Sequence, residues 1–145
     1  MKAIVNKKGL FNYEALETFE AGLKLLGTEV KSLKLGRVSF EGSYISFSGN
    51  EAYVINLTIP AHQPKNAPKG YAPERPRKLL LHKKELDYLK GKSQEKGLTV
   101  IPTKVYTARG VLKLEIAICR RKKKYDKREV LKKKAQKRDT ERELR

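Results

Sequence analysis

The side chains that most often perform covalent chemistry are scarce in this sequence. It has one cysteine, Cys119, and two histidines, His62 and His82, and none belongs to a motif that would place a nucleophile beside a base. These three residues also lack the short spacings of a zinc site, and no Gly-x-x-x-x-Gly-Lys-Ser/Thr run predicts a phosphate-binding loop. We therefore expect a protein that is not an enzyme and binds no metal or cofactor, with Cys119 as a small apolar filler.

Cationic side chains are abundant instead. The chain has 34 Lys and Arg against 16 Asp and Glu, a net charge of +18. This balance favours a polyanionic partner, either a nucleic acid or an acidic membrane. No apolar stretch approaches the roughly 20 residues that cross a bilayer, and no signal-peptide pattern opens the chain. We therefore expect a nucleic-acid partner, no membrane partner and a cytoplasmic location, with which a single cysteine agrees.

Three clusters of cations could contact phosphate groups. The first comprises Lys31, Lys34 and Arg37, with Glu29 among them. Glu29 could interact with the dipole of a helix, or it could accept hydrogen bonds from a base edge or a ribose hydroxyl. The second cluster is Arg75, Arg77, Lys78, His82, Lys83 and Lys84, and the third is residues 120–124.

Hydrophobic periodicity predicts the elements that position these clusters. Alternation of apolar and polar residues, clearest in Leu112, Leu114, Ile116 and Ile118, is typical of strands with one buried face. It predicts five strands, at 13–25, 43–48, 51–59, 98–107 and 111–119, the first with a bulge near residue 22. A short helix capped by Thr28 should follow the first strand, and a second helix should span 83–96. Five of the six prolines fall in 60–77, which we expect to be a long loop.

This order of elements predicts an all-β-dominated fold. A helix between the third and fourth strands is typical of the oligonucleotide-binding barrel, closed or nearly closed, here with two to three short helices. An RNA-recognition sheet would need aromatic pairs on two strands, and we find none. We expect residues 1–120 to form this RNA-binding body. Residues 121–145 should form a basic tail, disordered when free because it has few apolar residues, and helical when bound because it lacks Gly and Pro.

Several strings of residues, in order from about Asn6 to Arg142, resemble a known family. They include Asn6-Lys7-Lys8, Gly27-Thr28-Glu29-Val30-Lys31-Ser32-Leu33, Arg77-Lys78-Leu79-Leu80-Leu81-His82-Lys83 and Asp126-Lys127-Arg128-Glu129. On these residues the chain resembles the SmpB family (small protein B), the SsrA-binding proteins of bacterial trans-translation. One departure is Arg121, where the family usually has glycine.

The resemblance implies an adaptor that binds the tRNA-like domain of transfer-messenger RNA. It would bring this RNA to stalled ribosomes, with elongation factor Tu as an indirect partner, and would replace the missing anticodon arm. We expect a monomer. The implied RNA contacts are Asn6, Lys7, Lys8, Thr28, Glu29, Lys31, Arg75, Arg77, Lys78, His82, Lys122 and Lys123. The tail would enter the empty mRNA channel of the small subunit and contact the decoding centre through Tyr125, Asp126, Lys127 and Arg128.

Two other classes of function fit a small basic chain with a tail. A structural ribosomal protein would remain on ribosomal subunits through a high-salt wash, whereas an adaptor would dissociate. A nuclease or another RNA-modifying enzyme would produce new RNA ends, but the sequence has no acid–base pair to perform that reaction.

Overall fold

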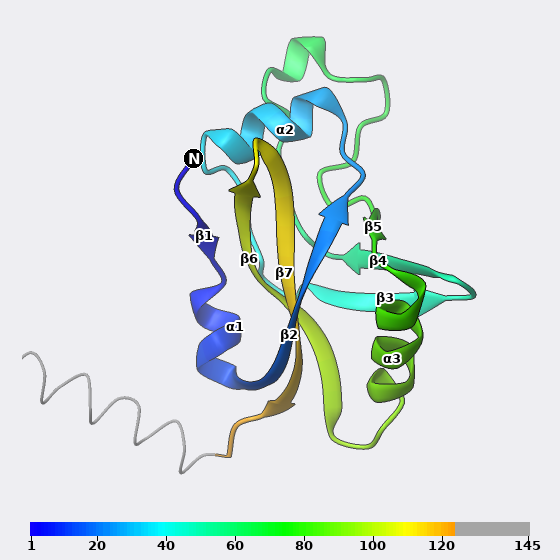
Figure 1. Ribbon diagram of the computed structural model, residues 1–145. Helices are drawn as coiled ribbons and strands as arrows, with labels where there is room; N and C mark the ends of the chain where they lie inside the picture. The colour runs from blue at the N-terminus through cyan, green and yellow to red at the C-terminus, as the bar shows by residue number, and fades with distance from the viewer. Residues whose placement is uncertain (124–145) are drawn as a thin grey trace, which may run out of the picture.

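The computed structural model describes residues 1–123, so most of the expected tail lies outside the described residues. The described chain has strands, three α-helices and one 3₁₀ turn (Figure 1). In order they are β1 (Ile4–Val5), α1 (Lys7–Asn12), β2 (Tyr13–Leu23), α2 (Gly27–Lys34), β3 (Tyr44–Ser48), β4 (Glu51–Ile55), η1 (Pro64–Asn66), β5 (Arg77–Leu80), α3 (Lys83–Ser93), β6 (Leu98–Ala108) and β7 (Val111–Arg121).

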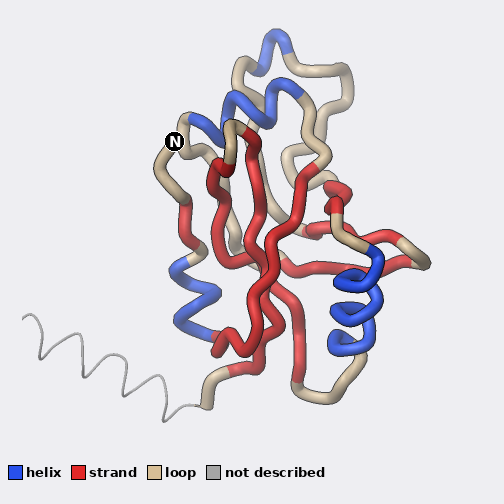
Figure 2. Tube along the Cα trace, in the orientation of Figure 1, coloured by secondary structure: helices blue, strands red, loops and turns tan. Residues whose placement is uncertain are grey.

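All seven strands of this region join one antiparallel sheet in the order β1-β6-β7-β2-β5-β4-β3 (Figure 2). The expected all-β-dominated class is therefore confirmed, but the described sheet is not a closed barrel. Its two edges, β1 and β3, do not pair with each other, and β3 instead lies close to β6. One physical reason is length, because β1 has only two residues and cannot supply a full seam of hydrogen bonds.

The strands β1 and β5 and the helix α1 were not predicted from the sequence. β5 arises at the end of the proline-rich segment, where Arg77 pairs with Val54 of β4 and Leu80 with Gly22 of β2. α1 contains a glycine and is short, so its sequence has little helical signal. The bulge of β2 lies between Ala15 and Glu17 rather than near residue 22.

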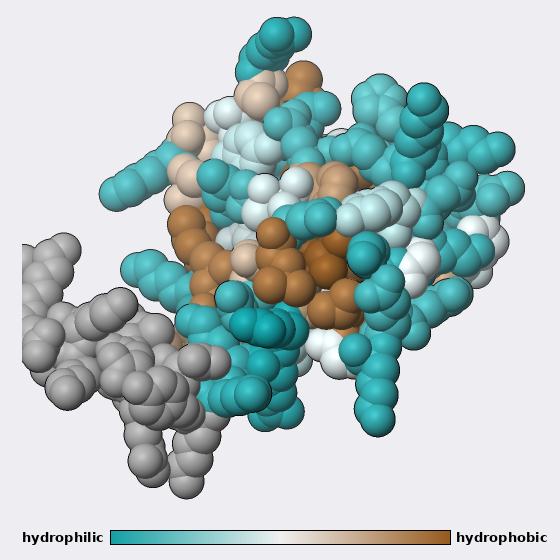
Figure 3. Space-filling model, turned by 60° about the horizontal axis from the view of Figure 1, so that its bottom comes forward, coloured by the Kyte–Doolittle hydropathy of each residue, from teal (hydrophilic) through white to brown (hydrophobic). Residues whose placement is uncertain are grey.

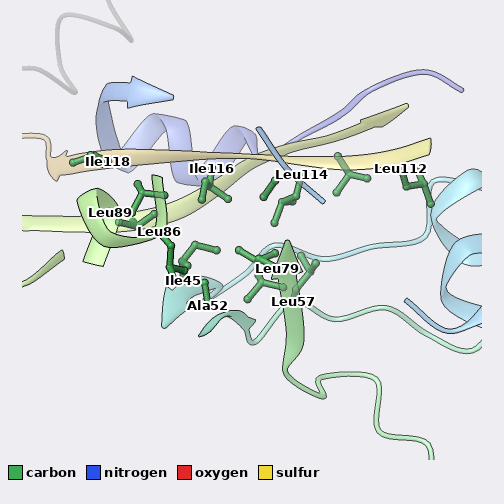
Figure 4. Close-up of a cluster of buried hydrophobic side chains, with 14 of the residues drawn as sticks. Ile45, Ala52, Leu57, Leu79, Leu86, Leu89, Leu112, Leu114, Ile116 and Ile118 are labelled. Atoms are coloured by element: carbon green, nitrogen blue, oxygen red, sulfur yellow. The ribbon is translucent and has the colours of Figure 1, made fainter. Parts of the chain in front are cut away.

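The main core lies between β7 and the strands β3, β4 and β5, which face it across the curved sheet. Leu112, Leu114, Ile116 and Ile118 point from β7 to one side, as their alternation predicted (Figure 4). Ile45, Ala52, Leu57 and Leu79 face them, and α3 adds Leu86 and Leu89. Burial of this apolar surface is the main source of stability, and it holds α3 against the sheet.

A smaller cluster occupies the other face of β6 and β7. It contains Ile101, Ala117 and Cys119, with Tyr13 packed against it, and α1 lies beside β2 and β6 on the sheet. Burial raises the pKa of the Cys119 thiol to about 11. A thiol with such a pKa is almost entirely protonated at neutral pH, which agrees with a packing role for this residue.

Candidate nucleic-acid interface

The buried carboxylate of Glu29 connects α2 to the end of the proline-rich segment. Its side chain is fully buried in the first turn of α2. Glu29 Oε1 accepts hydrogen bonds from the backbone N–H of Leu26 at 2.8 Å and from Arg75 Nη2 at 2.5 Å. Glu29 Oε2 accepts from Arg75 Nε at 3.0 Å and from Arg77 Nε at 2.5 Å. One carboxylate thus holds two guanidinium groups from the end of the proline-rich segment.

Arg77 extends this network into the interior. Its side chain is fully buried and donates to the backbone carbonyls of Leu57 and Pro73, the latter at 2.8 Å. It also donates to the hydroxyl of Tyr71 at 3.2 Å, and that hydroxyl donates to the carbonyl of Ile59 at 2.7 Å. A buried guanidinium is costly unless its donors are paired, and here each of its three nitrogens has a partner.

Two further hydrogen bonds attach the segment 60–76 to α2. Thr28 was expected to cap the helix, but α2 begins at Gly27, and the Thr28 hydroxyl oxygen instead accepts from the backbone N–H of His62 at 2.8 Å. The buried Ser32 hydroxyl donates to the carbonyl of Pro60 at 2.5 Å. The segment therefore lies beside α2 as an ordered loop, at the top of Figure 1.

The network also determines the charge state of Glu29. Burial alone would raise the pKa of the Glu29 carboxyl. Hydrogen bonds from Arg75, the Leu26 amide and Arg77 outweigh burial, so the pKa is lowered from its ordinary value. Glu29 is therefore charged at neutral pH, with both oxygens occupied by groups of its own chain. It is better placed to hold Arg75 and Arg77 than to accept a hydrogen bond from RNA.

The exposed cations above this network are the groups that phosphates can reach. Lys31, Lys34 and Arg37 are exposed on α2 and just after it, and none forms an ion pair within residues 1–123. Lys34 also lines a surface cavity of about 450 Å³ together with Lys2 and Lys7. The cationic surface thus continues from α2 toward the N-terminal strand.

A second group of expected contacts lies along a groove of about 720 Å³ between β2, β5 and α3. Lys78 and His82 line it, together with Lys113 and the carboxylates Glu20, Glu51 and Glu85. Lys78 pairs with Glu51 at 3.2 Å, so part of its charge is neutralised. His82 is exposed and begins α3 as its N-cap residue.

The third group lies around α1, which follows β1 and is drawn below α2 in Figure 1. Asn6 is buried, and its Oδ1 accepts from Gly9 N at 3.0 Å while its Nδ2 donates to the Pro102 carbonyl at 2.8 Å. Lys8 pairs with Glu41 at 3.4 Å, and Lys7 is exposed.

The Lys122 N–H donates to the Asn12 carbonyl at 2.9 Å, which brings Lys122 and Lys123 close to the end of α1. Figure 3 turns the bottom of Figure 1 toward the reader. This face has many hydrophilic side chains around a smaller apolar area.

The structure therefore separates the expected RNA contacts into three places. Thr28, Glu29, Lys31, Arg75 and Arg77 lie together, Lys78 and His82 line the groove, and the remaining described residues surround α1. Tyr125, Asp126, Lys127 and Arg128 lie outside the described residues. Tyr71, in the Glu29 network, and Ser32, which holds Pro60, have no signal in the sequence, because neither belongs to a charged cluster.

Residues 1–123 contain no group of three His, Cys, Asp or Glu side chains that could hold a metal ion. No helix in this range has the length and apolar character needed to span a bilayer.

A sheet-rich, strongly basic body with exposed cations at both ends defines a class of small nucleic-acid-binding protein. The model of the family described as "SmpB protein" matches residues 3–145, and the chain belongs to this family. An "SsrA-binding protein" of Thermosipho africanus is 50% identical over 135 residues, covering 92% of this chain and 90% of the relative. Another, of Solidesulfovibrio magneticus, is 48% identical over 140 residues, covering 97% and 90%.

A solved structure extends the likeness to three dimensions. It is described as "tmRNA-SmpB: a journey to the center of the bacterial ribosome" and matches with a TM-score of 0.71 and 46% sequence identity. The match covers 84% of this chain and 85% of that chain.

Proposed function

We propose that this protein is the transfer-messenger RNA adaptor of trans-translation. It binds the tRNA-like domain of this RNA and brings it to stalled ribosomes, where its partners are the ribosome and, indirectly, elongation factor Tu. The observation that carries this function is family membership over residues 3–145, together with relatives named for SsrA binding. The adaptor acts by binding, without catalysis, in the bacterial cytoplasm.

The geometry supports a division of work at the upper end of the molecule. Lys31 is exposed and bears a charge that phosphate can approach, whereas Glu29 and Arg77 are fully buried. Glu29 and Arg77 therefore position α2 and the adjoining loop, and Lys31 with its exposed neighbours contacts the RNA backbone. Arg75 is intermediate, because its side chain is 31% exposed while it is bound to Glu29.

Binding by such contacts should be dominated by phosphate and should weaken with salt. Lys78 and His82 in the groove, and Lys7, Lys8, Lys122 and Lys123 near α1, extend the cationic surface to further parts of the RNA or to the ribosome. Tyr125, Asp126, Lys127 and Arg128 act in the empty mRNA channel.

The test compares two double variants with the same loss of charge. Lys31→Ala/Lys34→Ala removes two exposed cations from α2. Lys92→Ala/Lys96→Ala removes one half-buried cation of α3, which pairs with Glu95, and one exposed cation just after this helix. We expect the first variant to bind the folded tRNA-like RNA at least about tenfold more weakly in a filter-binding titration. The second should bind within about twofold of the parent.

An equal loss in both variants would mean that only net charge matters and that α2 is no specific contact. Failure of the parent protein to prefer this RNA over a bulk transfer RNA pool would contradict the proposed function itself.

A further inference from the structure

A pocket of about 330 Å³ lies between α1 and the turn that precedes β3. Three aromatic side chains line it, namely Tyr13 at the start of β2, Phe40 in the turn and Tyr44 at the start of β3. Tyr44 is 44% exposed and makes no side-chain hydrogen bond with the rest of residues 1–123. The volume of the pocket is in the range of those that hold small ligands, and the aromatic lining suits a planar ligand.

Both walls of this pocket are held in place before any ligand binds. On one side, the Asn6 side chain joins α1 to the carbonyl of Pro102 in β6. On the other, the Ser43 hydroxyl donates to the Phe40 carbonyl at 2.6 Å and closes the turn, where Gly42 has a φ of +74°. A preformed pocket loses little conformational entropy on binding.

One cation lines the pocket, and two others lie next to lining residues. Lys8 lines it, and Arg121 is the cross-strand partner of Tyr13. The Lys122 N–H is bonded to the carbonyl of Asn12, which also lines the pocket. The rim can therefore hold the phosphates of a nucleotide while the aromatic residues hold its base.

The pair between Lys8 and Glu41 crosses the pocket rim. Their side chains are 73% and 77% exposed, so the 3.4 Å contact is a surface ion pair with little stabilising effect. An incoming phosphate can replace the Glu41 carboxylate as the partner of Lys8.

We propose that this pocket binds one unstacked nucleobase of single-stranded RNA, with its flanking phosphates on Lys8, Arg121 and Lys122. Tyr44, with Tyr13 and Phe40, provides the stacking surface. None of Glu29, Arg75 and Arg77 lines this pocket, so the site is distinct from their network and goes beyond the folded tRNA-like partner. It rests on the proposed function only in that the ligand is RNA.

The probe is an eight-nucleotide single-stranded RNA with 2-aminopurine at its fourth position, titrated with the full-length protein. A second oligonucleotide has an abasic site at that position. Stacking on Tyr44 should quench 2-aminopurine fluorescence. We expect Tyr44→Ala to weaken binding at least about fivefold, because base–aromatic stacking contributes about 1–3 kcal/mol. Tyr44→Phe keeps the ring and should bind within about twofold of the parent.

Two further variants separate stacking from general effects. Tyr88→Ala removes a tyrosine of similar exposure from α3 and should leave affinity unchanged. Glu41→Gln removes the carboxylate that competes with phosphate for Lys8 and should tighten binding about twofold to threefold.

The abasic oligonucleotide makes the test independent of protein variants. The parent should bind it as weakly as Tyr44→Ala binds the intact RNA, and Tyr44→Ala should show no additional loss. Equal affinity of the parent for both oligonucleotides would mean phosphate contact alone and would overturn the proposal. A parent that binds the oligonucleotide but not the folded tRNA-like RNA would contradict the proposed function and leave this site standing.

Discussion

At the scale of single residues, Glu29 is the side chain on which the candidate interface depends most. It is an acidic residue in a strongly basic chain, and it is fully buried between two arginines. A buried ion pair contributes little net stability compared with apolar packing, but loss of one partner leaves the other charge buried and unpaired. Substitution of Glu29 should therefore affect the fold as well as RNA binding.

We expect Glu29→Gln to lower the free energy of unfolding by about 3 kcal/mol at pH 7, measured by urea denaturation. The pKa of Glu29 in the folded state is below its ordinary value of 4.5, so its contribution is present above pH 4.5 and is lost as the pH falls through the lowered folded pKa. The difference between parent and variant should therefore narrow below about pH 4.5.

Glu51→Gln is the matched control, because Glu51 is also paired with a cation, Lys78, but on the surface. We expect no measurable change in the urea midpoint. A Glu29→Gln protein as stable as the parent at pH 7 would show that Arg77 finds other partners without cost.

At the scale of elements, the short helix α1 depends on Asn6. A six-residue helix has too few internal hydrogen bonds to be stable alone, so its cap and its packing must hold it. The Asn6 side chain supplies both a cap to Gly9 and a tie to Pro102. An alanine at position 9 would bring a Cβ within 2.4 Å of the Asn6 side chain, so the glycine leaves room for this cap.

We expect Asn6→Ala to lower the free energy of unfolding by about 2 kcal/mol, because it removes the cap and leaves the buried Pro102 carbonyl without its donor. Thermal unfolding followed by circular dichroism measures the change. Lys8→Ala on the same helix removes only the exposed pair with Glu41 and is the control. Equal effects of the two substitutions would contradict the role of Asn6 as a cap.

At the scale of the whole molecule, the described body and the segment after it are expected to act on different partners. The body continues through Arg121, and Lys122 is still bonded to Asn12. Truncation after Lys123 therefore removes none of the described contacts. It is a cleaner test of the segment than a cut after residue 120, which would remove the end of β7.

We expect protein truncated after Lys123 to bind the tRNA-like RNA within about threefold of the full chain, because the cations near α2 remain. It should fail to support peptide tagging on stalled ribosomes in a reconstituted translation assay. Full-length protein at equal concentration is the control. Normal tagging by the truncated protein would remove residues 124–145 from the proposed mechanism.

Much of the fold and part of the site could be predicted from local pattern. Alternation located β7 and its buried face, and Gly36 and Arg109-Gly110 have the positive φ values expected of a helix end and a hairpin turn. Net charge indicated a polyanionic partner. Alternation and turns depend on neighbours in the sequence, and net charge depends on composition, so the sequence alone determines these features.

Tertiary structure decided the rest. In the sequence, Arg77 is one cation among several. Only the pairing of β5 between β2 and β4 places its side chain in the interior beside Glu29. Tyr13 is far in sequence from Phe40 and Tyr44, and it meets them only because α1 and the turn before β3 border one pocket. Burial and partner choice depend on contacts between distant segments, and one sequence without its fold contains no local signal for them.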